Sequence, residues 1–305
     1  MANQHDMSII LATDSASRVR LVIESIRSAM SRCSVEIVVV CGGDAASGFD
    51  SDITVITVPS VYPLAAARAA GIIAASGRRV FIGETHSFPG AGMFDALLAV
   101  HNDGAIVAVP AFENENPETL LSWAGFINGY APWSVGRPAG ELERAPIFNA
   151  SYDRNFLAGL GDILPHVLMS GEDLMSRVRS VNGRVMFEPG AVIGHVNISR
   201  LRAWLVQRIV AGRVIASVRS AGWPVPRRML YAVAFPLIPF VLMNRYRSSI
   251  DRTVRSNNVS LALWPLLALG MMFQAIGEAL GYAWGRDEHS ENRYDRFEIE
   301  QMDYA

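Results

Sequence analysis

The first 110 residues alternate short β-branched stretches with stretches in which apolar residues recur at helical spacing. This alternation restricts the fold more than any other feature, because strands that alternate with helices form parallel sheets with right-handed crossovers. We predict strands at residues 7–13, 35–41, 53–58, 79–83 and 105–110, and helices at 16–30, 64–75 and 94–101. The second strand is continuously apolar, which is typical of a strand buried on both faces. The chain is therefore predicted to be an α/β protein with a mostly parallel sheet flanked by helices.

Polar residues follow the carboxyl ends of the predicted strands, where parallel sheets bind ligands. Thr13 and Asp14 follow the first strand, Asp44 follows the second, and Glu84 and His86 follow the fourth. The turn after the first strand, TDSASR, contains no glycine, so the dinucleotide-binding pattern GxGxxG is absent there, and the chain has no Walker A sequence. These absences argue against a dehydrogenase and against a nucleoside triphosphatase.

A second group of polar residues lies between residues 171 and 195. Glu172 and Asp173 open an amphipathic helix, where the helix dipole favours carboxylates, and an Asn-Gly pair ends it. We predict two short strands after this helix, separated by a Pro-Gly turn, with His195 at the end of the second. Each residue also has a structural interpretation, because acidic residues cap many helices and a lone His at a strand end is often a buried structural residue.

Length and composition set further limits. The 305 residues are enough for one catalytic domain and an appendage, and the net charge of −2 gives no basic field that would attract nucleic acid. Cys33 and Cys41 lie in or beside a predicted βαβ unit and are expected to be reduced. The N-terminal sequence has no basic segment followed by a long apolar stretch, so we expect no signal peptide and a catalytic part in the cytoplasm.

From residue 7 to about residue 220 the chain resembles family 2 glycosyltransferases, which are inverting enzymes with a GT-A nucleotide-sugar-binding fold. The resemblance rests on the strand that ends before Asp44, on the segment LAAARAAGIIAASGRRVFIGETH, and on residues 171–195. It implies a UDP- or GDP-linked sugar as donor. The residues expected to contact the donor are Thr13, Asp14, Asp44, Arg68, Glu84, Asn149, Ser151 and Arg154. For the segment that carries the last three, the alternative is an ordinary helix start capped by Ser151 or Asp153.

The metal motif departs from the family pattern. Where the family usually has Asp-x-Asp, whose carboxylates bind a divalent ion that bridges the donor diphosphate, this chain has Glu84-Thr85-His86. Mg²⁺ prefers oxygen ligands, whereas imidazole suits Mn²⁺ and later transition ions. With His195 the motif predicts a site of two His and one carboxylate for Mn²⁺ or Mg²⁺. The alternatives are that one of the pair binds the metal while the other contacts phosphate or ribose, or that the loop binds no metal.

The resemblance also implies the residues that act on the acceptor. In an inverting transfer a carboxylate takes the proton from the acceptor hydroxyl as this oxygen attacks the anomeric carbon. By position Asp173 is the expected base and Glu172 its support. The segment RAWLVQR resembles the family's Trp- and Arg-containing helix near the acceptor and the diphosphate, and its residues there are Arg202, Trp204, Gln207 and Arg208. An arginine-rich amphipathic helix beside a membrane has the same pattern.

Two apolar stretches distinguish the last third of the chain. Residues 229–243 are too short to span a bilayer and contain two prolines, whereas residues 259–284 are long enough. Arginines flank the first stretch on both sides, so it is expected to lie in the interface or to re-enter. The alternative is that both stretches pack against each other or in a homo-oligomer. We predict a GT-A catalytic domain at 1–222, membrane-associated helices at 223–285 and a mobile polar tail at 286–305.

Taken together, these features predict an enzyme that moves a sugar from a nucleotide-diphosphate donor to a polyprenyl-diphosphate-linked glycan in surface polysaccharide synthesis. The expected location is the cytoplasmic face of the bacterial inner membrane, and no nucleic-acid partner is expected. Two alternatives stay open at this point. One is transfer directly to polyprenyl phosphate, and the other is an inactive GT-A domain that serves as a membrane scaffold.

Overall fold

The computed structural model describes residues 5–305. The chain forms two compact units. The first contains the residues up to Glu113 and Arg137–Gly194, and the second contains Asn114–Gly136 and His195–Ala305. The predicted divisions at residues 222 and 285 are therefore not those of the structure. The segment after residue 200 and the last twenty residues belong to one helical unit, together with a segment from the middle of the chain.

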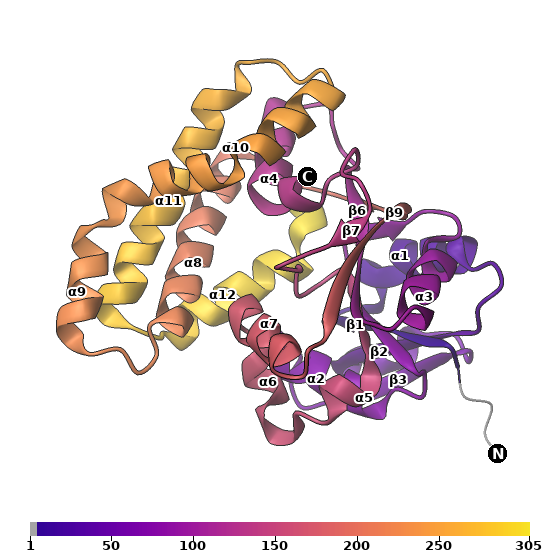
Figure 1. The fold of residues 1–305 in the computed structure, drawn as a ribbon. Helices are drawn as coiled ribbons and strands as arrows, with labels where there is room; N and C mark the ends of the chain where they lie inside the picture. The colour runs from indigo at the N-terminus through magenta and orange to yellow at the C-terminus, as the bar shows by residue number, and fades with distance from the viewer. Residues whose placement is uncertain (1–4) are drawn as a thin grey trace. The chain divides into compact units, whose positions relative to one another are not determined.

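The first unit is built on a sheet whose strands lie in the order β3-β2-β1-β4-β8-β6-β9-β5 (Figure 1). The strands are β1 (Met7–Thr13), β2 (Val35–Gly42), β3 (Ile53–Val58), β4 (Arg79–Ile82), β5 (Ser87–Pro89), β6 (Ala105–Asn114), β7 (Gly140–Glu141), β8 (Ala150–Asp153) and β9 (Arg184–His195). Strands β1 to β4 are parallel, and β8 runs antiparallel to both β4 and β6. The five strands predicted from the alternation are confirmed as β1, β2, β3, β4 and β6.

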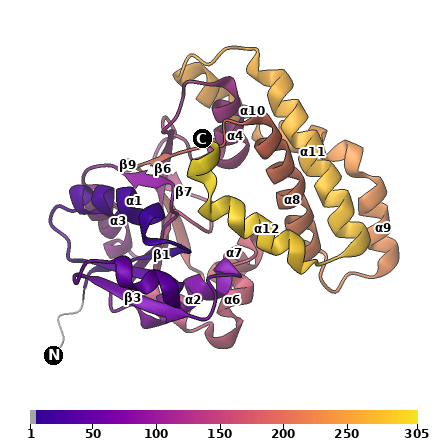
Figure 2. The same ribbon diagram turned by 180° about the vertical axis from the view of Figure 1, so that it is seen from behind.

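Helices cover both faces of this sheet. They are α1 (Ala16–Ala29), α2 (Leu64–Ala74), α3 (Met93–Asn102), α5 (Arg154–Ala158), α6 (Leu164–Val167) and α7 (Gly171–Ser180), with the short turns η1 (Gly43–Gly48) and η3 (Gly161–Ile163). The chain moves from β1 through α1 to β2 in one direction and from β3 through α2 to β4 in the other. Right-handed crossovers therefore place α1 and α2 on opposite faces, as Figures 1 and 2 show.

A half-buried carboxylate joins the amino-terminal half of the parallel strands. Glu36 on β2 accepts hydrogen bonds from Ser8 on β1, from Thr54 on β3 and from both the backbone and the hydroxyl of Ser76 after α2. Burial raises the pKa of this carboxyl, but the four hydrogen bonds together lower it below the ordinary value. Glu36 is thus ionised in the fold and fixes the register of three neighbouring strands.

Strand β9 differs from the prediction of two strands with a Pro-Gly turn between them. It runs without interruption through Pro189, and its buried side chains keep the same parity on either side of it. Before the proline β9 bonds β7 through Met186 and Phe187, and after it Val192 accepts from the backbone of Gly90. Pro189 lies between these two stretches of pairing, where a residue without an N–H is tolerated in a strand.

The second unit is helical. Its elements are α4 (Leu120–Tyr130), η2 (Ala131–Trp133), α8 (Leu201–Arg219), α9 (Val225–Val233), η4 (Phe235–Leu237), α10 (Ile238–Ser256), α11 (Leu263–Trp284), α12 (Glu288–Ile299) and η5 (Gln301–Tyr304). Helices α8 and α11 approach each other through glycines. A Cβ on Gly212 would lie 2.1 Å from the carbonyl oxygen of Gln274, and one on Gly277 would lie 2.0 Å from that of Ile209. Only glycine permits such an approach of two helix backbones.

Helix α11 is also the one helix in the described residues that is long and apolar enough to be a candidate span by itself, with a mean hydropathy of 1.4. Helices α9 and η4–α10 meet the same criterion only as a pair bent by 51°.

The residues after 285 are ordered, which contradicts the prediction of a mobile polar tail. Helix α12 packs on α8 and buries Phe297 and Ile299. The side-chain amide of Gln301 donates to the carbonyl of Val196 over 2.7 Å, and the backbone N–H of Ser199 donates to the carbonyl of Tyr304 over 2.8 Å. The apolar residues that hold this segment are spaced among charged ones, so average polarity conceals them.

Candidate metal and donor site

Three potential metal ligands gather at the carboxyl end of the sheet. Glu84 and His86 follow β4, and His195 is the last residue of β9. One ligand atom from each lies within 4.8 Å of the other two, and all three side chains are buried. Nε2 of His86 lies 3.5 Å from the Glu84 carboxylate. The structure therefore brings together the two-His-one-carboxylate cluster that the sequence predicted.

Asn149 orients the carboxylate of this cluster. Its side-chain amide donates to Oε2 of Glu84 over 2.5 Å and to Oγ of Ser87 over 2.8 Å, and the Ser87 hydroxyl donates to Glu84 over 3.1 Å. Asn149 has a φ of 54°, in the left-handed region that Asn tolerates better than other residues with a side chain. Its backbone N–H donates to the carbonyl of Ile82 over 2.6 Å, which fixes the loop against the end of β4.

Asn197 selects the tautomer of His195. The Asn197 amide nitrogen donates to the carbonyl of His195 and to Oδ1 of Asn114, so its own Oδ1 is the atom that faces Nδ1 of His195, at 3.0 Å. Nδ1 is therefore the donor in this pair, and in a neutral His195 ring Nε2 is the nitrogen that can ligate a cation. The His195 ring also packs against the ring of Tyr130, with centroids 4.2 Å apart.

The donor set fits a transition cation. Two imidazoles and one carboxylate suit Mn²⁺ or a later first-row ion, whereas Mg²⁺ is held by oxygen ligands and retained waters. Burial strengthens the field of the carboxylate, and the bonds from Asn149 and Asn197 supply the outer support that metal ligands ordinarily have. Glu84, His86 and His195 are therefore the residues that would hold such an ion.

Arg68 supplies a buried positive charge beside this loop. It is 4% exposed on α2, and its guanidinium lies 3.6 Å above the ring centroid of Phe148, the residue before Asn149. Its Nε has no hydrogen-bond partner among the described residues. A buried cation held by an aromatic face and lacking a carboxylate partner in the described chain is suited to bind an anionic group. Arg68 was predicted to contact the donor, and its surroundings fit that role.

The two predicted catalytic acids lie at the start of α7. Ser170 caps this helix by accepting from the backbone of Asp173, as helix N-caps do. Both acids are exposed, but Glu172 is held by Arg179 at 2.9 Å and by Arg144 at 3.8 Å. The carboxylate of Asp173 forms no ion pair or hydrogen bond within the described residues. Of the two carboxylates, that of Asp173 is therefore the one available to accept a proton from an acceptor hydroxyl.

The start of α7 lies close to the Asn149 loop. A Cβ on Gly171 would be 3.6 Å from the side chain of Ile147, two residues before Asn149. The loop that orients Glu84 therefore also contacts the helix that carries Asp173. Both belong to the first unit, so their proximity follows from the fold of that unit alone.

Two predicted donor contacts lie elsewhere. Strand β8 leaves the site antiparallel to β4, so it pairs Ala150 with Ile82 at the site end and Asp153 with Arg79 at the opposite end. Arg154 follows Asp153 and is thus five residues, or about 16 Å of extended chain, away from Asn149. Ser151 is fully buried and bonds Nε2 of His101 over 2.6 Å. Neither side chain is placed to contact a donor.

The remaining predicted donor residues lie at the ends of β1 and β2. Thr13 is buried and its hydroxyl donates to the carbonyl of Ser15, while Asp14 pairs with Arg18 at 3.2 Å. Asp44 lies in η1 directly after β2, and its side chain is outside the described part of the structure. The parallel registry brings these strand ends to the same edge of the sheet as Glu84, because β1 lies between β2 and β4.

The predicted acceptor residues on α8 divide into three kinds. Arg202 is exposed, whereas Trp204 is 1% exposed and fills the core of the helical unit against Gly270 of α11. This packing contradicts a role for Trp204 in contacting an acceptor. Gln207 is buried and accepts from Nε of Arg208 over 2.9 Å. Burial lowers the pKa of the Arg208 guanidinium, and Tyr294, Tyr130 and Glu298 partly offset this effect.

Sequence analysis missed Asn197, Tyr130 and Ser87. Asn197 stands two residues after His195, which is a usable signal for a residue that supports a ligand. Tyr130 reaches His195 from α4, 65 positions earlier in the chain, and no local pattern predicts that contact.

Comparisons with known proteins show the fold. No family model matches the chain, and no curated protein matches it in sequence. Among solved structures, a crystal structure of GalNAc-T7 with UDP, GalNAc and Mn²⁺ is similar, with a TM-score of 0.50 and 14% identity. The match covers 64% of this chain and 43% of that one, so the chain matches less than half the length of GalNAc-T7. The likeness shows an α/β fold of the GT-A type.

Proposed function

We propose that this chain is a nucleotide-sugar glycosyltransferase whose donor diphosphate binds at the carboxyl ends of β1 and β4. The observation that carries the proposal is the buried cluster of Glu84, His86 and His195 at this edge of a GT-A-type sheet. Arg68 adds a buried charge with no carboxylate partner among the described residues. The GalNAc-T7 structure with UDP and Mn²⁺ supports the pairing of a nucleotide with a transition cation on such a fold.

We further propose an inverting transfer of the kind made by family 2 glycosyltransferases. Asp173 takes the proton of the acceptor hydroxyl, whose oxygen bonds to the anomeric carbon while the bond from this carbon to the nucleoside diphosphate oxygen breaks. The diphosphate leaves with the electron pair, and Arg68 offsets its charge. A bound cation would supply additional charge stabilisation to the same leaving group. Glu172, held by two arginines, supports the helix start rather than the chemistry.

The proposed acceptor is a glycan on polyprenyl diphosphate, and the proposed location is the cytoplasmic face of a bacterial inner membrane. Arg208 and Gln207 are the residues that we propose for the acceptor diphosphate. Arg208 lies close to Tyr130, which packs on His195, and all three residues belong to the second unit. Arg202 is exposed on the same helix and is a further candidate.

Donor binding is tested by thermal unfolding of the purified full chain with UDP or GDP, each with Mn²⁺, with Mg²⁺ or with chelator. We expect one nucleotide to raise the Tm with Mn²⁺ and to lose most of this shift with chelator. Glu84→Gln and His195→Ala should abolish the metal-dependent part, while His166→Ala, an exposed His on α6, should retain it. No shift with either nucleotide would favour the inactive scaffold.

Catalysis is tested separately with Asp173→Asn. We expect nucleotide release in the presence of a polyprenyl-diphosphate glycan to fall by two to four orders of magnitude, the usual contribution of a general base. Asp162→Asn, an exposed acid on η3, is the matched control and should keep full activity. Polyprenyl phosphate in place of the glycan distinguishes the second transferase hypothesis. Unchanged nucleotide release by Asp173→Asn with either acceptor would remove Asp173 from the mechanism.

A further inference from the structure

Exposed apolar residues form an apolar face along α9, η4 and the first half of α10. Its exposed members are Val225, Met229, Leu230, Val233, Leu237, Phe240 and Val241. Val233 is 78% exposed and Phe240 is 72% exposed. Helix α9 buries none of its residues, and α10 buries only three, all in its last two turns. Scattered exposed apolar residues are ordinary in soluble proteins, but a patch of this kind marks an interaction surface.

This face is not a poorly packed core. Helices α9, η4 and α10 all contact α11 through their other sides. Arg228 donates to the carbonyls of Tyr282 and Ala283 over 2.8 and 3.1 Å, which anchors α9 on the last turn of α11. The outward direction of the apolar face is therefore a consequence of firm packing on the inner side.

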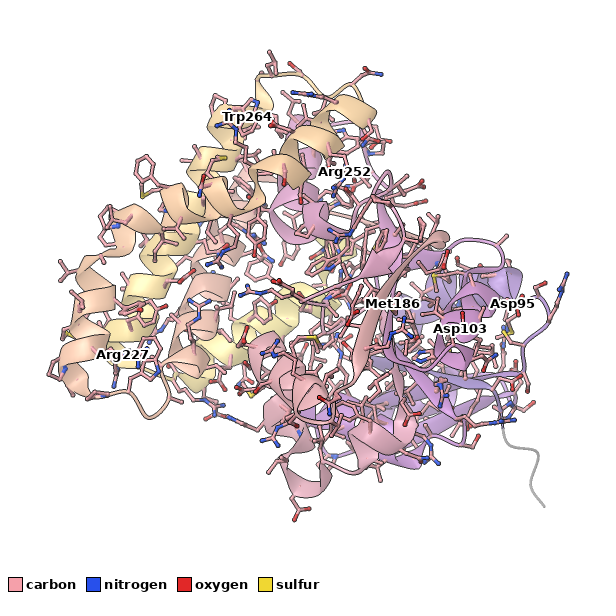
Figure 3. The ribbon with its side chains drawn as sticks, viewed as in Figure 1. Asp95, Asp103, Met186, Arg227, Arg252 and Trp264 are labelled. Atoms are coloured by element: carbon pink, nitrogen blue, oxygen red, sulfur yellow. The ribbon has the colours of Figure 1, made fainter. Side chains whose placement is uncertain are left out.

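The charge beside this face is mostly positive, since the only acidic residue of α9 and α10 is Asp251, which pairs with Arg247 over 3.9 Å. Residues 225–247 contain four arginines and no acidic residue. Arg227, labelled in Figure 3, stacks 3.8 Å above the ring of Trp223, while Arg245 and Arg247 are exposed. An apolar face bordered by arginines complements a bilayer with anionic headgroups, which accepts apolar side chains at the acyl boundary and cations at the phosphates.

We propose that this apolar face docks on the surface of an anionic phospholipid bilayer and that α11 does not cross it. The proposal extends beyond glycosyl transfer and does not depend on it. Helix α8 runs beside α11 at backbone contact through Gly212 and Gly277. It carries Arg213 and Arg219, which pair with Asp287 and Glu278. Crossing by α11 would take these charges into the hydrocarbon, which is strongly unfavourable.

Docking is tested by co-sedimentation of the full chain with vesicles of phosphatidylcholine alone or with 30% phosphatidylglycerol. The variant Leu230→Glu/Val233→Glu/Phe240→Glu removes three exposed members of the face. The matched control is Leu21→Glu/Ile73→Glu/Val181→Glu, which changes residues of similar exposure in the first unit. We expect wild type and control to bind anionic vesicles at least tenfold more tightly than the first variant, and 0.5 M NaCl to weaken their binding. Equal binding by all three proteins would overturn the proposal, as would preference for neutral vesicles or self-association through the face without vesicle binding.

The absence of crossing has its own test. Asn258→Cys and His289→Cys place thiols beyond the two ends of α11. In inverted membrane vesicles, whose cytoplasmic face is outside, a maleimide that cannot cross the bilayer should label both cysteines from the outside. Wild type measures the background labelling of the two native cysteines. Labelling of the two positions from opposite sides would show that α11 spans. Neither experiment uses a donor, so a negative result here is separable from failure of the proposed activity.

Discussion

Asn197 controls which nitrogen His195 presents to a cation. Because its amide nitrogen donates to the carbonyl of His195 and to Asn114, its Oδ1 accepts from Nδ1, which makes Nε2 the nitrogen of a neutral ring that can ligate a cation. A ring without this acceptor is free to place the proton on either nitrogen and to rotate. Outer partners of this type typically contribute ten- to a hundredfold to metal affinity.

We therefore predict that Asn197→Ala weakens Mn²⁺ binding by about tenfold or more. Titration of the full chain with Mn²⁺, followed by calorimetry, measures this. Asn116→Ala is the control, because Asn116 belongs to the same hydrogen-bond network but bonds the backbone of Asn197 rather than the His195 ring. Equal affinities for the two variants would mean that general loosening of the loop, and not the tautomer, sets affinity.

The buried side chain of His101 makes the stability of the protein depend on pH. Its Nδ1 donates to the carbonyl of Ala105 and its Nε2 accepts from Ser151. Burial lowers the pKa of His101 to about 4, while the pKa in an unfolded chain is 6.5. Between these values the unfolded chain binds a proton that the folded chain does not. The free energy of unfolding therefore decreases as the pH falls, by about 1.4 kcal/mol per pH unit.

Replacing His101 by Gln should remove this dependence. We expect His101→Gln to be less stable than wild type at pH 7.5, because the substitution removes the native hydrogen bonds of the ring. Between pH 6.5 and pH 4.5, however, the variant should lose less stability than wild type. Urea unfolding at several pH values checks the difference in slope. Parallel pH profiles for the two proteins would assign the acid sensitivity to carboxyls such as Glu36, whose stabilisation is lost at lower pH as it protonates.

At the scale of the element, the contact of α8 with α11 depends on the absence of side chains. We predict that Gly277→Ala destabilises the protein by at least about 2 kcal/mol, because the added methyl group would meet the Ile209 carbonyl oxygen and overpacking is costly. Gly129→Ala on α4 meets nothing within 4 Å and should be neutral or slightly stabilising, since Ala favours helices. Thermal unfolding followed by circular dichroism compares them. A neutral Gly277→Ala would show that the two helices can separate without loss of stability.

Elements with strong local periodicity were predictable, and those set by distant partners were not. The parallel strands and α1, α2 and α7 follow from patterns of burial that the sequence carries. Strand β9 was predicted as two strands because a Pro-Gly pair usually marks a turn. The proline is tolerated inside one strand because it lies where the pairing partner changes from β7 to β5.

The candidate site shows the same division. Glu84, His86 and His195 could be predicted because each stands at a strand end, and the sheet edge brings strand ends together. Ser151 and Arg154 were placed wrongly because the direction of β8 cannot be read from its four residues. Trp204 looked like a ligand contact, but an indole of that size fits the space that Gly270 leaves on α11.

On the scale of the whole molecule, the segment after residue 285 supports the loop that follows His195. Gln301 donates to Val196 and Tyr304 accepts from Ser199. We predict that Gln301→Ala lowers Mn²⁺ affinity several-fold without unfolding the protein, because one hydrogen bond contributes about 1 kcal/mol. Met302→Ala, an exposed neighbour, is the control. Metal titration and far-ultraviolet circular dichroism together decide whether an effect arises at the site or from loss of fold.

The support of Val196 by Gln301 also sets the order of events when the protein is made. Glu84 and His86 leave the ribosome long before His195. Gln301, whose side chain supports Val196, lies another 105 positions after Val196 and is made later still. At five to twenty residues per second, the delay is on the order of ten seconds. A nascent chain therefore carries all three potential ligands for some time before the cluster is held in place.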